Sequence, residues 1–164
     1  MSDRRIELLQ NMPVFGGVKG ETLEFILELA GERHVARGED FFRRDDEAVS
    51  FFVLESGHVD VLREYEGQDY ILSDLGPGDC FGEMAFIEIR TRNATVRATQ
   101  DCVAVEVPLD ALSKLYERDI EQYVLIQMNL AREISRRLRE ADRRLFEGMV
   151  AARDNGGEYW WYLD

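Results

Sequence analysis

The sequence is poor in the residues that build metal clusters and disulfide frameworks. It has two cysteines, Cys80 and Cys102, and two histidines, His34 and His58, in 164 residues. Two thiolates are too few for an iron–sulfur cluster or a cysteine-rich zinc site, so we expect reduced, partly buried thiols. The histidines form no His-x-His pattern for a metal-dependent enzyme and no nucleophile–base pair. The sequence therefore predicts a protein that is not an enzyme and needs no metal or cofactor.

The sequence also lacks a long apolar run and an excess of positive charge. No stretch approaches the ~20 apolar residues that span a bilayer, and the N-terminus has no signal-peptide core. With 20 Lys and Arg against 33 Asp and Glu, the formal net charge is −13. Phosphate backbones and anionic membranes repel such a chain, although a local basic site for a small anion remains open. We therefore expect a soluble, cytoplasmic protein that binds no membrane.

Glycine distribution and apolar spacing divide one domain, residues 1–153, into three zones. Residues 1–32 carry helical apolar spacing interrupted by proline and glycine, which predicts short N-terminal helices. Residues 33–108 hold short β-rich runs between glycine turns, which predicts an antiparallel sandwich, barrel or roll. Residues 109–153 return to helical spacing, and 154–164 form a tail that contains both tryptophans. The overall expectation is a mainly β domain with helices at both ends.

The last predicted helix, from Ile120 to Arg153, carries a heptad pattern of about two repeats. Its apolar positions, spaced alternately by three and four, are Ala131, Ile134, Leu138, Ala141 and Leu145. The pattern fits packing against the chain's own sheet as well as pairing with a second copy. Six arginines between 132 and 144 are interpreted as a solvated face. Only ~20 residues follow Leu145, fewer than a helix-turn-helix needs, so we expect no direct DNA binding.

Residues 76–98 combine the parts of a small-anion site. Gly82 lets backbone approach a ligand, and the helical turn expected after it presents free amides. Arg92 supplies a planar, permanently charged fork, and donors follow it at 93–95. Glu83 accepts hydroxyl protons, so the segment fits a phosphorylated sugar. On spacing alone, a surface ion pair between Glu83 and Arg92 explains the pattern equally well.

The same segment resembles the phosphate-binding cassette of the cyclic nucleotide-binding domain family. The resemblance rests on Phe81-Gly82-Glu83-Met84-Ala85, six further residues, and then Arg92-Asn93-Ala94-Thr95. Shorter matches extend it over about residues 6–145, at Leu8 to Phe15, Val35 to Glu39, Phe52 to Val59 and Leu75 to Asp79. It implies an antiparallel β-roll, a jelly-roll-like double-stranded β-helix, with N-terminal helices and a long C-terminal helix.

The resemblance also implies a ligand, cyclic AMP or cyclic GMP, and roles for individual residues. Glu83 accepts the ribose 2′-OH, and Arg92 pairs with the cyclic phosphate. The residues that offer backbone amides, or a hydroxyl close behind them, are Gly82, Met84, Ala85, Asn93 and Thr95. The residues that wall or contact the base are Leu72, Phe81 and Asp142.

Four positions depart from the family pattern. Ile89 stands where the family usually has Gly or Asn, and Thr91 where it has Pro, so the loop before Arg92 is expected to differ in shape or mobility. Asp45 replaces a common glycine in a hairpin turn away from the pocket. Asn93 stands where a hydroxyl residue often accompanies cyclic GMP preference, and the base therefore stays undecided.

The predicted function is a regulatory module in which nucleotide binding moves the C-terminal helix. Its predicted partners are a second copy, through that helix, or an effector protein. The alternative is a ligand-free roll that serves as a dimerisation or scaffold module. For the aromatic tail, residues 159–162, three interpretations stay open: packing on the chain's own surface, disorder, or closure over the nucleotide.

Overall fold

The structure of the chain, a computed structural model, describes residues 3–88 and 90–154. Its elements fall into two compact units, Met1–Asn129 and Leu130–Asp164, which are described separately. The three interpretations of the aromatic tail concern residues 159–162, which lie outside the described residues. None of the described helices combines the length and hydrophobicity that crossing a bilayer requires.

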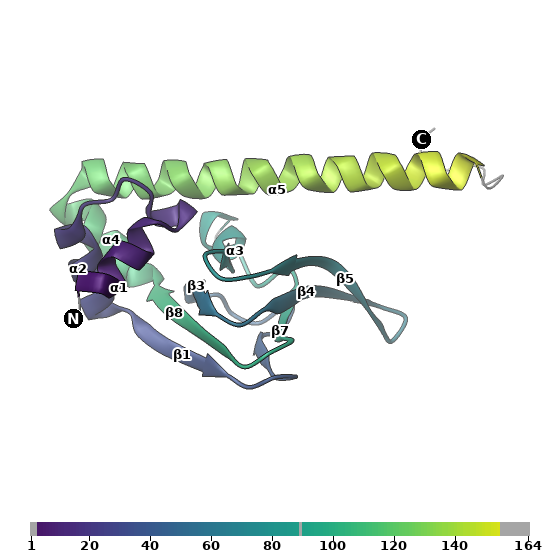
Figure 1. Cartoon of the computed structure of the whole chain (residues 1–164), viewed down its shortest axis with the longest axis horizontal. Helices are drawn as coiled ribbons and strands as arrows, with labels where there is room; N and C mark the ends of the chain where they lie inside the picture. Colours follow the sequence, from purple (N-terminus) through teal and green to yellow (C-terminus); the bar gives the residue numbers. More distant parts are fainter. Residues whose placement is uncertain (1–2, 89, 155–164) are drawn as a thin grey trace. The chain divides into compact units, whose positions relative to one another are not determined.

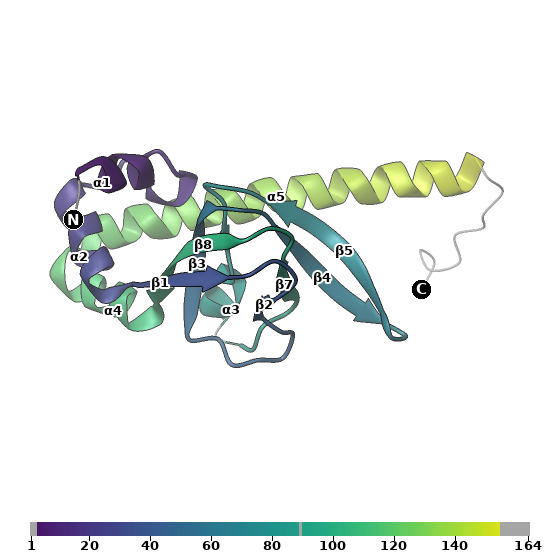
Figure 2. The same cartoon turned by 60° about the horizontal axis from the view of Figure 1, so that its bottom comes forward.

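Short helices gather at one end of the strands in the first unit (Figures 1 and 2). They are α1 (Asp3–Gln10), η1 (Pro13–Phe15), α2 (Gly20–Leu29) and α4 (Leu109–Arg118). Pro13 opens η1 at a position where its missing N–H costs nothing. Pro108 precedes α4, whose buried residues Ala111, Leu112 and Leu115 lie on one face. The expected N-terminal helices are therefore confirmed, with a 3-10 turn between them.

Two antiparallel sheets of four strands each make up the described β structure. The first sheet has the order β1-β8-β3-β6 and the second the order β2-β7-β4-β5. The strands are β1 (Gly31–Val35), β2 (Asp40–Phe42), β3 (Ser50–Ser56), β4 (Val59–Tyr65), β5 (Gln68–Leu75), β6 (Cys80–Phe81), β7 (Thr95–Ala98) and β8 (Cys102–Pro108). With helices before and after the strands, this arrangement confirms the predicted fold class.

The core between the strands contains an aromatic cluster. The rings of Phe52 and Phe81 stack with centroids 5.4 Å apart, and Phe41 meets Phe81 edge-on at 5.0 Å. Phe42 stacks on Phe52 at 5.9 Å from the partly buried side. Such pairs add about 0.5–1.5 kcal/mol each beyond the area they bury. The cluster packs β2, β3 and β6 against one another.

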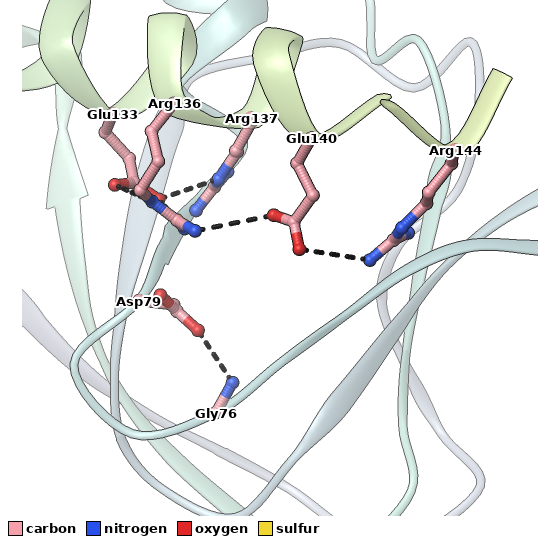
Figure 3. Close-up of polar contacts among 7 residues, drawn as sticks. All are labelled: Gly76, Asp79, Glu133, Arg136, Arg137, Glu140 and Arg144. Atoms are coloured by element: carbon pink, nitrogen blue, oxygen red, sulfur yellow. Dashed lines mark hydrogen bonds and ion pairs between the residues drawn. The ribbon is translucent and has the colours of Figure 1, made fainter. Parts of the chain in front are cut away.

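Positive backbone φ angles mark the turns that the chain requires. The hairpin between β4 and β5 has φ values of +52° at Glu66 and +78° at Gly67, a type I′ turn. Asp45, where the family pattern has glycine, has a φ of +71°. The turn before β6 is closed by the Gly76 amide, which donates to the Asp79 carboxylate at 2.9 Å (Figure 3).

The long helix α5 (Ile120–Asp154) begins in the first unit, where polar contacts hold it. Asn129 Nδ2 donates to the carbonyls of Val14 and Gly16 at 3.1 and 2.9 Å, and the Lys19 amide donates to Gln122 at 2.8 Å. These contacts fix the first turns of α5 on the loop after α1.

The second unit contains the rest of α5, with a ladder of ion pairs along it (Figure 3). Glu133 accepts from Arg136 at 2.6 Å and from Arg137 at 2.9 Å, and Glu140 pairs with Arg136 and Arg144 at 3.4 Å. These arginines thus have carboxylate partners within the helix. Glu133 is only 6% exposed, so this part of the helix is not the fully solvated face that the sequence predicts.

Candidate functional site

Arg92 lies in the loop before β7, and the loop between β2 and β3 fixes its backbone. The Arg92 amide donates to the Asp46 carbonyl at 2.9 Å, and the Asp45 amide donates to the Arg92 carbonyl at 2.8 Å. The side chain is 3% exposed, and its guanidinium carbon lies 4.1 Å from the centroid of the Phe42 ring. A buried arginine over an aromatic ring is held by cation–π attraction as well as by packing.

The guanidinium uses two of its nitrogens on backbone carbonyls and leaves the third without a partner. Nη1 donates to the Gly82 carbonyl at 2.9 Å, and Nη2 donates to the Ser50 carbonyl at 2.6 Å. Nε is buried and has no hydrogen-bond partner among the described residues. A buried donor without a partner costs about 1–3 kcal/mol. This orphaned N–H fits an acceptor from outside the chain, such as a phosphate oxygen.

Both the backbone conformation at position 82 and its contact with Arg92 require glycine. Its φ is +81°, a conformation that side chains rarely adopt. A Cβ at this position would lie 2.5 Å from Arg92 Nη1 and 3.2 Å from Phe42 Cε1. The absence of a side chain therefore allows the guanidinium to reach the Gly82 carbonyl.

Three carboxylates act on the charge of the buried guanidinium. Burial lowers the pKa of Arg92, and the charges of Glu106, Asp46 and Glu83 oppose that shift. Arginine stays charged because its ordinary pKa is so high. Glu83, the first residue of α3 (Glu83–Glu88), is 2% exposed, so the structure brings two buried and opposite charges into one region.

The other cassette residues lie around these two. Asn93 Nδ2 contacts Met84 Sδ at 3.4 Å, and Thr95 Oγ1 accepts the Arg44 amide at 3.0 Å. Ala85 belongs to α3.

The residues predicted to contact the base differ in their exposure. Phe81 is buried in the aromatic cluster, whereas Leu72 on β5 is 47% exposed. Asp142 is exposed on α5 in the second unit.

Four residues of the site carry no local signal of function in the sequence: Phe42, Asp46, Ser50 and Glu106. Phe42 ends β2, and Asp46 follows it in the loop before β3. Ser50 and Glu106 meet because β3 pairs with β8, with Phe52 opposite Glu106. A contact across 56 positions has no local signal in the sequence.

Comparison with known proteins agrees with this geometry. A family model described as a cyclic nucleotide-binding domain matches residues 32–119, which include the whole cassette. The chain belongs to the cyclic nucleotide-binding domain family. The resemblance seen in the sequence is thereby confirmed.

Individual relatives give the extent of the similarity. The chain is 31% identical over 142 residues to the cyclic AMP receptor protein of Thermus thermophilus, covering 84% of the chain and 62% of that protein. A cAMP-dependent protein kinase regulatory subunit of Eremothecium gossypii is 30% identical over 90 residues, 55% of the chain and 19% of that protein. The chain therefore spans only part of the curated relatives it matches.

Solved structures agree with the fold. The crystal structure of the Thermus thermophilus catabolite activator protein has a TM-score of 0.69 at 31% identity, covering 81% of this chain and 61% of that one. A cyclic nucleotide-binding domain from Methylobacillus flagellatus has a TM-score of 0.81 at 18% identity, covering 89% and 85%.

Proposed function

We propose that the chain is a regulatory module that binds cyclic AMP or cyclic GMP. Arg92 pairs with the cyclic phosphate, and Glu83 accepts the ribose 2′-OH. The observation that carries this proposal is the buried, unpartnered Nε–H of Arg92 in the same region as the buried carboxylate of Glu83. A ligand with an anionic oxygen accepts a hydrogen bond from the Arg92 Nε–H, and a ligand that also carries a hydroxyl group can donate to a carboxylate such as that of Glu83.

The remaining roles follow the family pattern and need no metal or cofactor. The proposed amide donors, with a nearby hydroxyl, are Gly82, Met84, Ala85, Asn93 and Thr95. The proposed base contacts are Leu72, Phe81 and Asp142. The proposal includes both cyclic nucleotides and a cytoplasmic location.

Pairing of two copies along α5 is part of the proposal. Leu138 and Leu145 are 60% and 51% exposed, which supports a seam that a second copy covers. If Leu138 is placed at heptad position a, Arg137 lies at the g position just before it. Asp142 then lies at the e position that follows. In a parallel pair of helices, Arg137 of one copy would lie near Asp142 of the other, so opposite charges would meet. In an antiparallel pair, Arg137 of one copy would lie near Arg144 of the other. Nucleotide binding would act on partners, including an effector protein, by changing the placement of this helix.

Leu138→Glu tests the seam, because it buries a charge between the helices. It should halve the mass measured by light scattering, whereas Val150→Glu, exposed and away from the seam, should leave it unchanged. An unchanged mass for Leu138→Glu would remove pairing from the proposal.

The second candidate is a ligand-free dimerisation or scaffold module. Its support is that Arg92 already has two backbone acceptors, so much of its bonding capacity is used within the chain. This candidate predicts no response to either nucleotide at millimolar concentration.

A pair of arginine variants tests the nucleotide site. Arg92→Leu should weaken nucleotide binding by at least tenfold, about 2–5 kcal/mol, because it removes the charged partner of a desolvated phosphate. Arg90→Leu, exposed and two positions away, should change the affinity less than twofold. Fluorescence titration measures both affinities, and circular dichroism checks that both variants fold. Equal losses would show that the phosphate partner has been assigned wrongly.

A further inference from the structure

Glu106 is a half-buried carboxylate on β8 that no part of the cassette motif includes. It pairs across the sheet with Phe52 of β3, whose ring belongs to the aromatic cluster beneath Arg92. The charge of Glu106, like those of Asp46 and Glu83, raises the pKa of Arg92 against the effect of burial. A negative charge that acts on the arginine of a phosphate site opposes the binding of an anion.

Ser50 connects this carboxylate with the guanidinium. Its carbonyl accepts the hydrogen bond from Arg92 Nη2 at 2.6 Å, and its hydroxyl donates to Glu106 Oε1 at 2.8 Å. Ser50 is 3% exposed, so water does not readily substitute for either contact. The hydroxyl therefore supplies Glu106 with a partner other than the arginine.

We propose that Glu106 competes with the ligand phosphate for Arg92 and thereby lowers nucleotide affinity, while Ser50 limits this competition by holding the carboxylate. The inference rests on the proposed function and adds a residue that tunes the same site. Glu106 is a positioning residue, because it acts on the ligand through the charge and placement of Arg92.

The proposal predicts opposite effects for two conservative variants. Glu106→Gln keeps an acceptor oxygen for the Ser50 hydroxyl but removes the competing charge, so nucleotide affinity should rise about fivefold or more. Ser50→Ala keeps the carbonyl but removes the hydroxyl. Glu106 then takes its missing hydrogen bond from the guanidinium, and affinity should fall about three- to tenfold. The double variant should have the same nucleotide affinity as Glu106→Gln, because the Ser50 hydroxyl affects binding only through the charge of Glu106.

Calorimetric titration with cyclic AMP and cyclic GMP measures these affinities. The control is Glu117→Gln, an exposed position on α4 with the same change in net charge, and it should stay within twofold of the unmodified chain. The 15N resonance of Arg92 Nε in the ligand-free protein is a second readout. It should move in Glu106→Gln and Ser50→Ala but not in Glu117→Gln.

The outcomes separate this inference from the proposed function. If the unmodified chain binds nucleotide and Glu106→Gln binds it equally or more weakly, the inference is overturned and the proposed function stands. A loss of affinity in both single variants would indicate a merely structural role, and it also overturns the inference. If neither the unmodified chain nor any variant binds nucleotide, the proposed function is wrong, and the inference, which rests on it, is wrong as well. Should Glu106→Gln not fold, equal or tighter binding by Ser50→Ala overturns the inference.

Discussion

Gly82→Ala perturbs the candidate site through a single added methyl group. The new Cβ would lie 2.5 Å from Arg92 Nη1, about 0.9 Å closer than the 3.4 Å at which ordinary contact begins. Arg92 must therefore withdraw, and the 2.9 Å hydrogen bond from Nη1 to the Gly82 carbonyl is lost. A lost hydrogen bond to a buried charged group costs about 1.5–3 kcal/mol. The left-handed backbone at Gly82 adds about 1–2 kcal/mol for any residue with a Cβ.

Gly67→Ala is the matched control for backbone strain. Gly67 has a φ of +78°, against +81° at Gly82, and a Cβ there would meet nothing within 4 Å. It should therefore lose only the conformational component, about 1–2 kcal/mol. The difference between the two variants, about 1.5–3 kcal/mol, isolates the effect on Arg92.

Urea denaturation gives both free energies of unfolding, and a nucleotide titration gives the affinities. We expect Gly82→Ala to be the less stable variant and to bind at least tenfold more weakly than Gly67→Ala. Equal stabilities and equal affinities would refute the idea that Gly82 is required by its contact with Arg92.

Three further predictions concern the stability of the roll. Asp40 accepts hydrogen bonds from Arg97 and Arg43 at 2.8 and 3.0 Å; burial raises its pKa, but these bonds lower it on balance. Asp40→Asn should therefore cost about 1 kcal/mol of unfolding free energy at neutral pH, and this difference should vanish as pH falls below about 4 through the folded-state pKa. Asp45→Gly should stabilise the chain by about 0.5–1 kcal/mol in urea denaturation, because it relieves a positive φ; no gain would contradict this. In Gly57→Ala the Cβ would lie 2.6 Å from a backbone oxygen that cannot swing away, so its loss in thermal unfolding should exceed that of Gly67→Ala.

Local patterns in the sequence predicted most of the elements. The zone predicted to hold strands, residues 33–108, ends with β8 at Pro108, and the zone predicted to be helical begins with α4 at Leu109. These features depend on residues close together in the chain, where spacing carries the information. The expectation that the turn at Asp45 lies away from the pocket is wrong, because the Asp45 amide donates to the Arg92 carbonyl at 2.8 Å.

Features that depend on strand pairing were not predictable in the same way. The two-residue strand β6 exists because Phe52 and Val53 pair with Phe81 and Cys80. Likewise, the sequence pointed to Arg92 as a phosphate ligand but not to its contact with the Ser50 carbonyl, 42 positions away. The register between distant strands decides both the pairing that forms β6 and the contact between Arg92 and Ser50. A shift of the register by one residue would turn each side chain to the other face of the sheet.

Calorimetric titration of the unmodified chain with cyclic AMP and cyclic GMP tests the central claim most directly. If the buried Arg92 and Glu83 form a nucleotide site, at least one of the two ligands binds saturably, with one molecule per chain. The absence of heat with both ligands up to millimolar concentration would contradict the claim.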